Sequence, residues 1–247
     1  MNLDQQFMAA VIEAYDAHGS GTEVLPTLLA QACVEVLGVA GAGVSMIDGE
    51  LRIPLGASDA VAARAEALQT GLGEGPCLEA TAKSEPLVAD ETAMALRWPM
   101  FHRELLTETP FRCVASIPLT SAQRRRFGAL DLYSTDSAAL LRLNLNEIYT
   151  QIADPVAGML FDVPRTVAED GTALPMWMNN DSITRRMKVW VAVGILMEHA
   201  DLTTADALAM LRAYAYSHGA SLDDIVDDIT TKRLHPDAVS ADRPDEA

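Results

Sequence analysis

The sequence is poor in cysteine and lacks the common catalytic motifs. Its three cysteines, Cys33, Cys77 and Cys113, form no CxxC pair and are odd in number, which argues against a disulfide framework and a zinc site. Phosphate-binding glycine loops, HExxH pairs and serine nucleophile elbows do not occur. We therefore expect no enzyme activity, no metal and no cofactor.

Long hydrophobic runs are missing as well. The longest strongly apolar stretch, Val189 to Met197, is far shorter than the ~20 residues of a membrane helix. The N-terminus has no basic region ahead of an apolar one, so a signal peptide is not expected. These absences predict a cytoplasmic protein that does not cross a membrane.

Basic residues are few, and they are spread unevenly along the chain. Lys and Arg number 18 against 35 Asp and Glu, for a formal net charge of -17. Residues 1–175 hold 23 acidic and 11 basic residues, whereas residues 176–235 hold 8 and 6. Because the larger part would repel a phosphate backbone, a nucleic acid partner is expected to bind at residues 176–235.

The hydrophobic periodicity changes twice along the chain, which predicts two parts joined by a linker. The first part reads as a mixture of helices and short strands, and the second as three helices. The predicted helices of the first part are 5–17, 24–37, 60–69 and 143–161, and its predicted strands are 42–48, 50–58, 86–91, 113–120 and 127–135. The linker is 162–180, and helical patterns then run over 181–199, from Thr203 to near Gly219, and from Ser221. The acidic tail is expected to be disordered.

Two sets of motifs resemble known families. The segments GLGEGPCLEA (71–80), RWPMF (97–101), VASIPL (114–119) and FGALDLYS (127–134) resemble a GAF sensor domain. Residues 184–229 resemble an ANTAR domain, the three-helix RNA-binding output module of bacterial antitermination regulators. The chain is thus similar to actinobacterial GAF-ANTAR proteins.

This resemblance implies an α+β fold with an N-terminal GAF-like antiparallel sheet and flanking helices, followed by a small three-helix ANTAR-like domain. The implied boundaries are a sensor domain over 1–161 with its core at about 20–161, a linker over 162–180, an output domain over 181–234 and a tail over 235–247. The implied function is a signal-responsive regulator that binds RNA stem-loops and antiterminates transcription.

One departure from the ANTAR pattern weakens the RNA inference. Residues Val191 to Gly194 read Val-Ala-Val-Gly where the family usually has Gln-Ala-Lys-Gly, so the family's lysine is Val193 here. A valine at an RNA-facing position would remove a phosphate contact and make that face more apolar. The alternative function is therefore a protein-interaction or dimerisation regulator that has lost RNA binding.

The candidate RNA contacts are Arg185, Arg186, Lys188 and Arg212. The first three form a basic cluster at the start of the first output helix, and Arg186 and Arg212 match family positions. Lysine and arginine contacts to phosphate would contribute affinity and its salt dependence. The alternatives are a solvated helix face and, for Arg212, pairing with a nearby acidic residue.

A heptad-like stripe on the same helix is the candidate dimer interface. Ile183, Met187, Trp190 and Gly194 are separated by steps of four, three and four. Because three helices of this size make a thin core, part of the stripe is expected to pack on a second subunit of a homodimer. Burial against the other two helices is the alternative.

The candidate ligand-binding residues of the sensor are Cys77, Trp98 and Phe101. Cys77 follows Gly-Glu-Gly-Pro and could be a sensing thiol or a buried cysteine at a turn. Trp98 and Phe101 could line a small-molecule pocket or pack in the core. A GAF-like methionine sulfoxide reductase is a third possibility, but the three cysteines show no recognisable catalytic pair.

Overall fold

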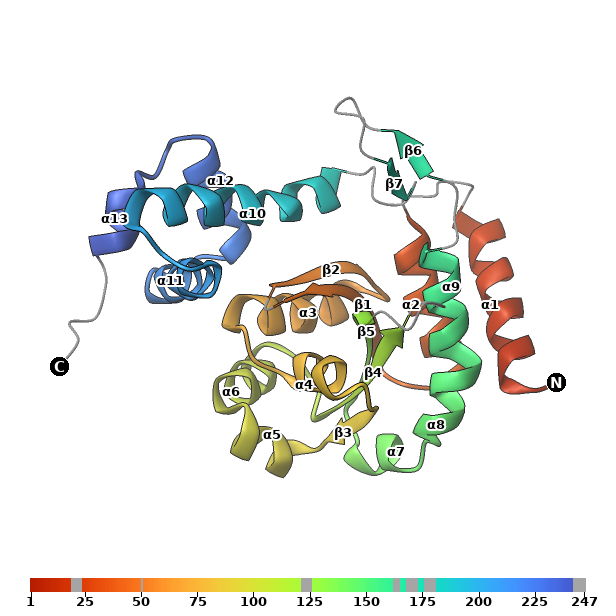
Figure 1. Ribbon diagram of the computed structural model, residues 1–247. Helices are drawn as coiled ribbons and strands as arrows, with labels where there is room; N and C mark the ends of the chain where they lie inside the picture. The colour runs from red at the N-terminus through yellow and green to blue at the C-terminus, as the bar shows by residue number, and fades with distance from the viewer. Residues whose placement is uncertain are drawn as a thin grey trace.

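A five-stranded antiparallel sheet organises the N-terminal domain, residues 1–161, in the computed structural model (Figure 1). The structure describes residues 1–18, 24–49, 51–120, 126–161, 165–167, 173–175 and 181–241. The sheet has the order β2-β1-β5-β4-β3. Its strands are β1 (Gly41–Asp48), β2 (Leu51–Ala57), β3 (Leu87–Ala89), β4 (Cys113–Thr120) and β5 (Arg126–Ser134).

The hairpin between β1 and β2 forms where the sequence predicts it. Asp48 is paired with Leu51 across the turn, and Gly49 has a φ of 61°, a left-handed conformation that glycine adopts without a Cβ clash. This hairpin leaves β2 at one edge of the sheet.

Helices cover both faces of the sheet because each strand alternates its apolar side chains between two cores. On β4, Cys113, Ala115 and Ile117 belong to one buried cluster, whereas Val114 belongs to the other. The first face carries α1 (Leu3–His18), α2 (Leu25–Leu37), α7 (Ser137–Leu141), α8 (Leu145–Ile148), a π-helical turn (Tyr149–Ala153) and α9 (Asp154–Phe161). The second carries α3 (Ala60–Leu72), α4 (Pro76–Lys83), α5 (Glu91–Arg97) and α6 (Pro99–Glu108).

The run predicted as one helix over 143–161 is divided by the π-helical turn. Pro155 stands in the first turn of α9, where its missing N–H removes no intrahelical hydrogen bond from α9. The widened turn directly before it, Tyr149–Ala153, lets the helical path continue past the proline.

Four helices form the C-terminal helical domain, residues 181–241. They are α10 (Asp181–Ala200), α11 (Thr204–Ser217), α12 (Leu222–Thr230) and α13 (Pro236–Ala241). The predicted caps are present, since Thr203 Oγ1 accepts from the Asp206 N–H at 3.2 Å and Ser221 Oγ accepts from the Asp224 N–H at 3.1 Å. The core face of α10 consists of Val189, Ala192, Val193 and Leu196.

The structure differs from two expectations for the segments that flank the helical domain, which are the tail after it and the linker before it. Residues 236–241 form α13 with Val239 only 1% exposed, so the prediction of a disordered tail is wrong there, because Val239 completes the small core. Residues 242–247 lie outside the described part of the chain. Within the predicted linker, β6 (Arg165–Val167) and β7 (Ala173–Pro175) pair antiparallel.

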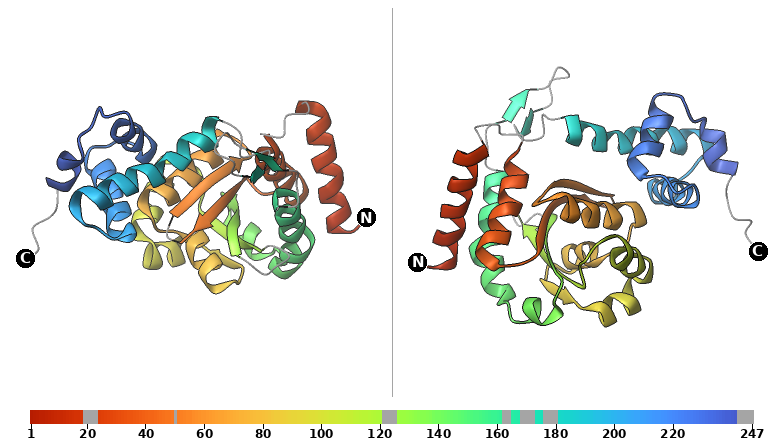
Figure 2. Two further views of the ribbon diagram at one scale, coloured as in Figure 1. Left: turned by 45° about the horizontal axis from the view of Figure 1, so that its top comes forward. Right: turned by 180° about the vertical axis from the view of Figure 1, so that it is seen from behind.

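The helical domain packs on the N-terminal domain beside the edge strand, and α10 contacts β2 while α11 contacts α3 (Figures 1 and 2). We call this the docked arrangement. The helical domain lies on the opposite side of the N-terminal domain from α1 and α9 (Figure 1). Among the described residues, no helix has the length and apolar character needed to cross a bilayer.

Candidate functional site

A buried ionic cluster lies between β2, α3 and β5. Arg52 of β2 donates to Asp131 Oδ2 at 2.9 Å, to the carboxylate of Glu66 and to the Glu66 carbonyl at 2.8 Å. All three side chains are at most 1% exposed. A buried arginine is tolerated here because two carboxylates face it.

Neutral polar groups extend the hydrogen bonding of this cluster. Gln69 Nε2 donates to Asp131 Oδ2 and to Tyr133 Oη, both at 3.0 Å. The Tyr133 hydroxyl donates to Glu66 Oε1, and the Ser116 hydroxyl donates to the remaining oxygen of Asp131. The cluster therefore holds Arg52, Glu66 and Asp131 in a hydrogen-bonded network in which Arg52 Nε has no partner among the described residues.

Burial sets the proton affinity of Glu66. The net pKa of Glu66 is raised to about 7, chiefly because burial desolvates the carboxyl; the nearby Asp131 also raises it, whereas Arg52 and the Tyr133 hydroxyl lower it. The cluster consequently changes its charge near neutral pH.

Arg212 of α11 makes a hydrogen bond between the helical domain and the C-terminal end of α3. Its Nε donates to the Thr70 carbonyl at 3.2 Å. Thr70 is in the last turn of α3, where carbonyls have no intrahelical partner and a cation is favoured by the helix dipole. The guanidinium lies so close to Gly73 that a Cβ there would overlap it.

Thr70 connects this contact with the buried cluster. Its hydroxyl accepts from Arg52 Nη1 at 3.2 Å, while its carbonyl accepts from Arg212. A second contact between the domains joins Arg103 of α6 to the hydroxyl of Tyr216 on α11. The docked arrangement therefore rests on polar contacts from two helices of the N-terminal domain.

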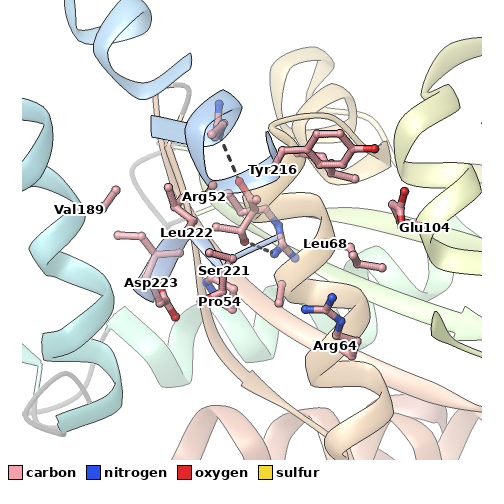
Figure 3. Close-up of a pocket in the computed structure, with 18 of the residues that line it drawn as sticks. Arg52, Pro54, Arg64, Leu68, Glu104, Val189, Tyr216, Ser221, Leu222 and Asp223 are labelled. Atoms are coloured by element: carbon pink, nitrogen blue, oxygen red, sulfur yellow. Dashed lines mark hydrogen bonds between the residues drawn. The ribbon is translucent and has the colours of Figure 1, made fainter. Parts of the chain in front are cut away.

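A pocket of about 430 Å³ lies at this junction, and we call it the interdomain pocket. Figure 3 shows Arg64 and Leu68 of α3 on one side and Val189 and Leu222 of the helical domain on another. Further lining residues are Leu51, Arg52, Ile53 and Pro54 of β2, Glu104 and Glu108 of α6, and Arg212, Tyr216 and Asp223.

Two of the four predicted RNA contacts have described side chains, and both of these side chains are engaged in polar contacts. Arg212 faces α3, and Lys188 Nζ bonds Asp227 Oδ1 of α12 at 3.1 Å. The side chains of Arg185 and Arg186 lie outside the described residues. RNA contact by these four residues stays a prediction.

Val193 occupies a position different from the one expected. The sequence comparison placed it on an RNA-facing surface, but it is 2% exposed and packs in the core of the helical domain with Val189, Ala192 and Leu196. The expectation of a more apolar surface at this residue is therefore wrong. Val191, by contrast, is 54% exposed.

The predicted dimer stripe follows the border of the core. Met187 and Trp190 are partly buried against it, and a Cβ on Gly194 would meet open space. The side chain of Ile183 lies outside the described residues. The dimer interface stays a prediction.

The predicted ligand residues of the sensor are in closed core. Cys77 and Phe101 are fully buried and Trp98 is 8% exposed, and none of the three lines the interdomain pocket. Burial raises the pKa of the Cys77 thiol, with Arg52 opposing the shift. A thiol in this state is poorly reactive.

The sheet order and the helices on both faces define an α+β domain, and comparison with known proteins identifies its family. The family model for the GAF domain matches residues 20–157, more than half of the chain, and the chain belongs to this family. The match ends before the helical domain. No curated protein matches the chain.

Two solved structures are similar to the N-terminal domain. One is the GAF domain from a phosphoenolpyruvate-protein phosphotransferase of Coxiella burnetii, with 14% identity and a TM-score of 0.45, covering 63% of this chain and 91% of that one. The other is a domain of a Sinorhizobium meliloti 1021 protein described as a two-component sensor histidine kinase. It has 15% identity and a TM-score of 0.41, covering 56% of this chain and 90% of that one.

Proposed function

We propose that this chain is a signal-responsive regulator whose GAF domain controls RNA binding by the helical domain. In this proposal the helical domain is an ANTAR-like module that binds RNA stem-loops and antiterminates transcription. The resemblance of residues 184–229 to that module and the membership of residues 20–157 in the GAF family support it.

The observation that carries the proposal is the position of Arg212. This candidate RNA contact is engaged by the Thr70 carbonyl of the GAF domain. A side chain that caps α3 is not available to a phosphate, so the docked arrangement is the state with weak RNA affinity. Release of the helical domain would free the guanidinium, which gives the sensor control of the output.

Two other cations of the helical domain are paired with carboxylates of the same domain, so their pairing does not depend on docking. Lys188 pairs with Asp227, and Arg233 pairs with Asp227 at 2.7 Å and with Asp228 at 2.6 Å. Cations already neutralised by carboxylates contribute little to phosphate binding. Arg212 is therefore the described cation whose availability depends most directly on docking.

Fluorescence anisotropy of the full chain against tandem stem-loop RNAs, over a salt series, tests the function. Arg212→Ala should weaken binding and reduce the slope of log affinity against log salt by about 1. Arg142→Ala is the matched control, because Arg142 is an exposed arginine of the GAF domain whose side chain is 73% exposed. Absence of hairpin-selective binding in every variant and at every salt concentration would contradict the proposal.

A second candidate function is protein interaction or dimerisation through α10. The exposed side chain of Val191, next to the half-buried Trp190, favours it. Under this alternative, Val191→Lys lowers the oligomer mass measured by multi-angle light scattering. An unchanged mass together with intact RNA binding would reject it.

A further inference from the structure

The interdomain pocket is an open cleft with the volume of a ligand site. Small-molecule pockets begin at roughly 300 Å³ and are common at domain interfaces. This pocket has about 430 Å³. Its walls come from both domains (Figure 3), so an occupant would touch both.

Apolar side chains form the body of the pocket. Ile53 and Leu68 contribute from the GAF domain, and Val189 and Leu222 from the helical domain. All four are less than 9% exposed. An apolar molecule placed between them would be removed from water on both of its sides.

Several charged side chains around the pocket already have polar partners. Arg64 Nη2 bonds Glu108 Oε1 at 2.7 Å, and its Nε bonds the other oxygen. Arg103 bonds Glu104 at 3.0 Å. Arg52 is neutralised by the two carboxylates of the buried cluster, and Arg212 and Asp223 both have interaction partners. A charged ligand would have to compete with these pairs while losing its own hydration.

The hydroxyl of Tyr216 is a hydrogen-bond donor at the exposed rim of the pocket, since this residue is 46% exposed. The Tyr216 hydroxyl accepts from Arg103, and within the described chain its own proton has no acceptor. A phenol can donate and accept at once. A carbonyl or ether oxygen of the ligand would use the remaining donor.

We propose that the interdomain pocket binds an uncharged small organic molecule with an apolar body and a hydrogen-bond acceptor directed at Tyr216. Because this molecule contacts both domains, it binds the docked arrangement in preference to the released one and stabilises docking by mass action. Its effect on RNA rests on the proposed function. If that function holds, the ligand and RNA oppose each other, and the coupling is reciprocal.

The probe for the test is prodan, an uncharged dye with an apolar body and a carbonyl acceptor, titrated by fluorescence into the full chain. Gly71 of α3 lines the pocket, and a Cβ there meets open space. Gly71→Leu therefore introduces a side chain at the pocket wall from a Cβ position that is open. Ala17→Leu is the control, because Ala17 is an exposed residue of α1 and does not line the pocket.

The expected result is saturable prodan binding by the wild-type chain and by Ala17→Leu, with loss of binding in Gly71→Leu. Tyr216→Phe should weaken binding several-fold, as expected for one lost hydrogen bond. Absence of prodan binding, or equal binding by Gly71→Leu, would overturn the proposal. Equally tight binding of the anionic dye anilinonaphthalene sulfonate, also lost in Gly71→Leu, would overturn the assignment of an uncharged ligand.

Failure of the proposed RNA function and failure of the pocket proposal give different combinations of prodan and RNA binding. If prodan binds as expected but no stem-loop RNA binds with or without it, the pocket is confirmed and the RNA function is rejected. If RNA binds but prodan does not, the pocket proposal alone is rejected.

Discussion

Replacing Glu66 with glutamine should remove a pH dependence of stability that this one carboxyl imposes. Burial raises its pKa from 4.5 to about 7 in the folded chain, so the folded state binds this proton more tightly than the unfolded state. The stabilising effect is complete below pH 4.5 and is lost as the pH rises through about 7. A shift of this size corresponds to about 3 kcal/mol.

The assay is urea unfolding of wild-type and Glu66→Gln chains at about pH 5 and about pH 8. Other groups titrate in both chains, so the difference between the two pH dependences isolates Glu66. Wild-type should lose about 3 kcal/mol more than the variant on going to the higher pH. Glu13→Gln, which changes an exposed glutamate of α1, should behave as wild-type. Equal pH dependences in wild-type and Glu66→Gln would refute the reasoning.

Other predictions concern the cores and one cap. Arg52→Met leaves two buried carboxylates without their cation and should cost about 3–5 kcal/mol in urea unfolding; a neutral result would mean that the ion pairs contribute no net stability. Cys33, Cys77 and Cys113 are buried with raised pKa values, so a disulfide reagent should label them far more slowly in the native chain than after unfolding; fast native labelling would contradict this. Thr203→Ala removes the cap of α11 and should cost about 1 kcal/mol by thermal unfolding, whereas an unchanged melting curve would contradict it.

Much of the N-terminal fold could be predicted from local pattern. The apolar runs of β4 and β5 and the Asp48-Gly49 turn are strong signals, and the structure has all five strands where they were expected. The helices α5 and α6 were not predicted. They are short, and their starts depend on two local devices, the Asp90 side chain that accepts from the Ala93 N–H at 2.8 Å and Pro99 in the first turn.

The buried cluster could have been suspected but not assembled from the sequence. Arg52 and Asp131 interrupt otherwise apolar strands, and a charge in such a place signals a buried partner. Nothing local pairs them, because they come together with Glu66 only through the sheet and α3. The same holds for Arg212, whose partner Thr70 is 142 residues away.

Val193 shows where a family comparison misled and periodicity would not have. The core face of α10 is Val189, Ala192, Val193 and Leu196, which is an ordinary helical stripe with steps of three, one and three. Assigning Val193 to an RNA surface followed the family's lysine rather than this stripe. The core was readable from the sequence alone.

The central claim is that docking through Arg212 restrains RNA binding. The most direct test displaces the Arg212 side chain by a substitution at a different residue. A Cβ on Gly73, whose φ is 67°, would overlap the Arg212 guanidinium, whereas one on Gly38, whose φ is 63°, would meet nothing. Both glycines end a helix in a left-handed conformation, so Gly73→Ala and Gly38→Ala carry the same backbone cost of about 1–2 kcal/mol.

The measurement is stem-loop RNA affinity by fluorescence anisotropy for these two variants and wild-type. If docking restrains RNA binding, Gly73→Ala binds RNA more tightly than wild-type, Gly38→Ala binds as wild-type, and adding Arg212→Ala to Gly73→Ala abolishes the gain. Equal affinity of Gly73→Ala and Gly38→Ala would contradict control of the helical domain through this contact.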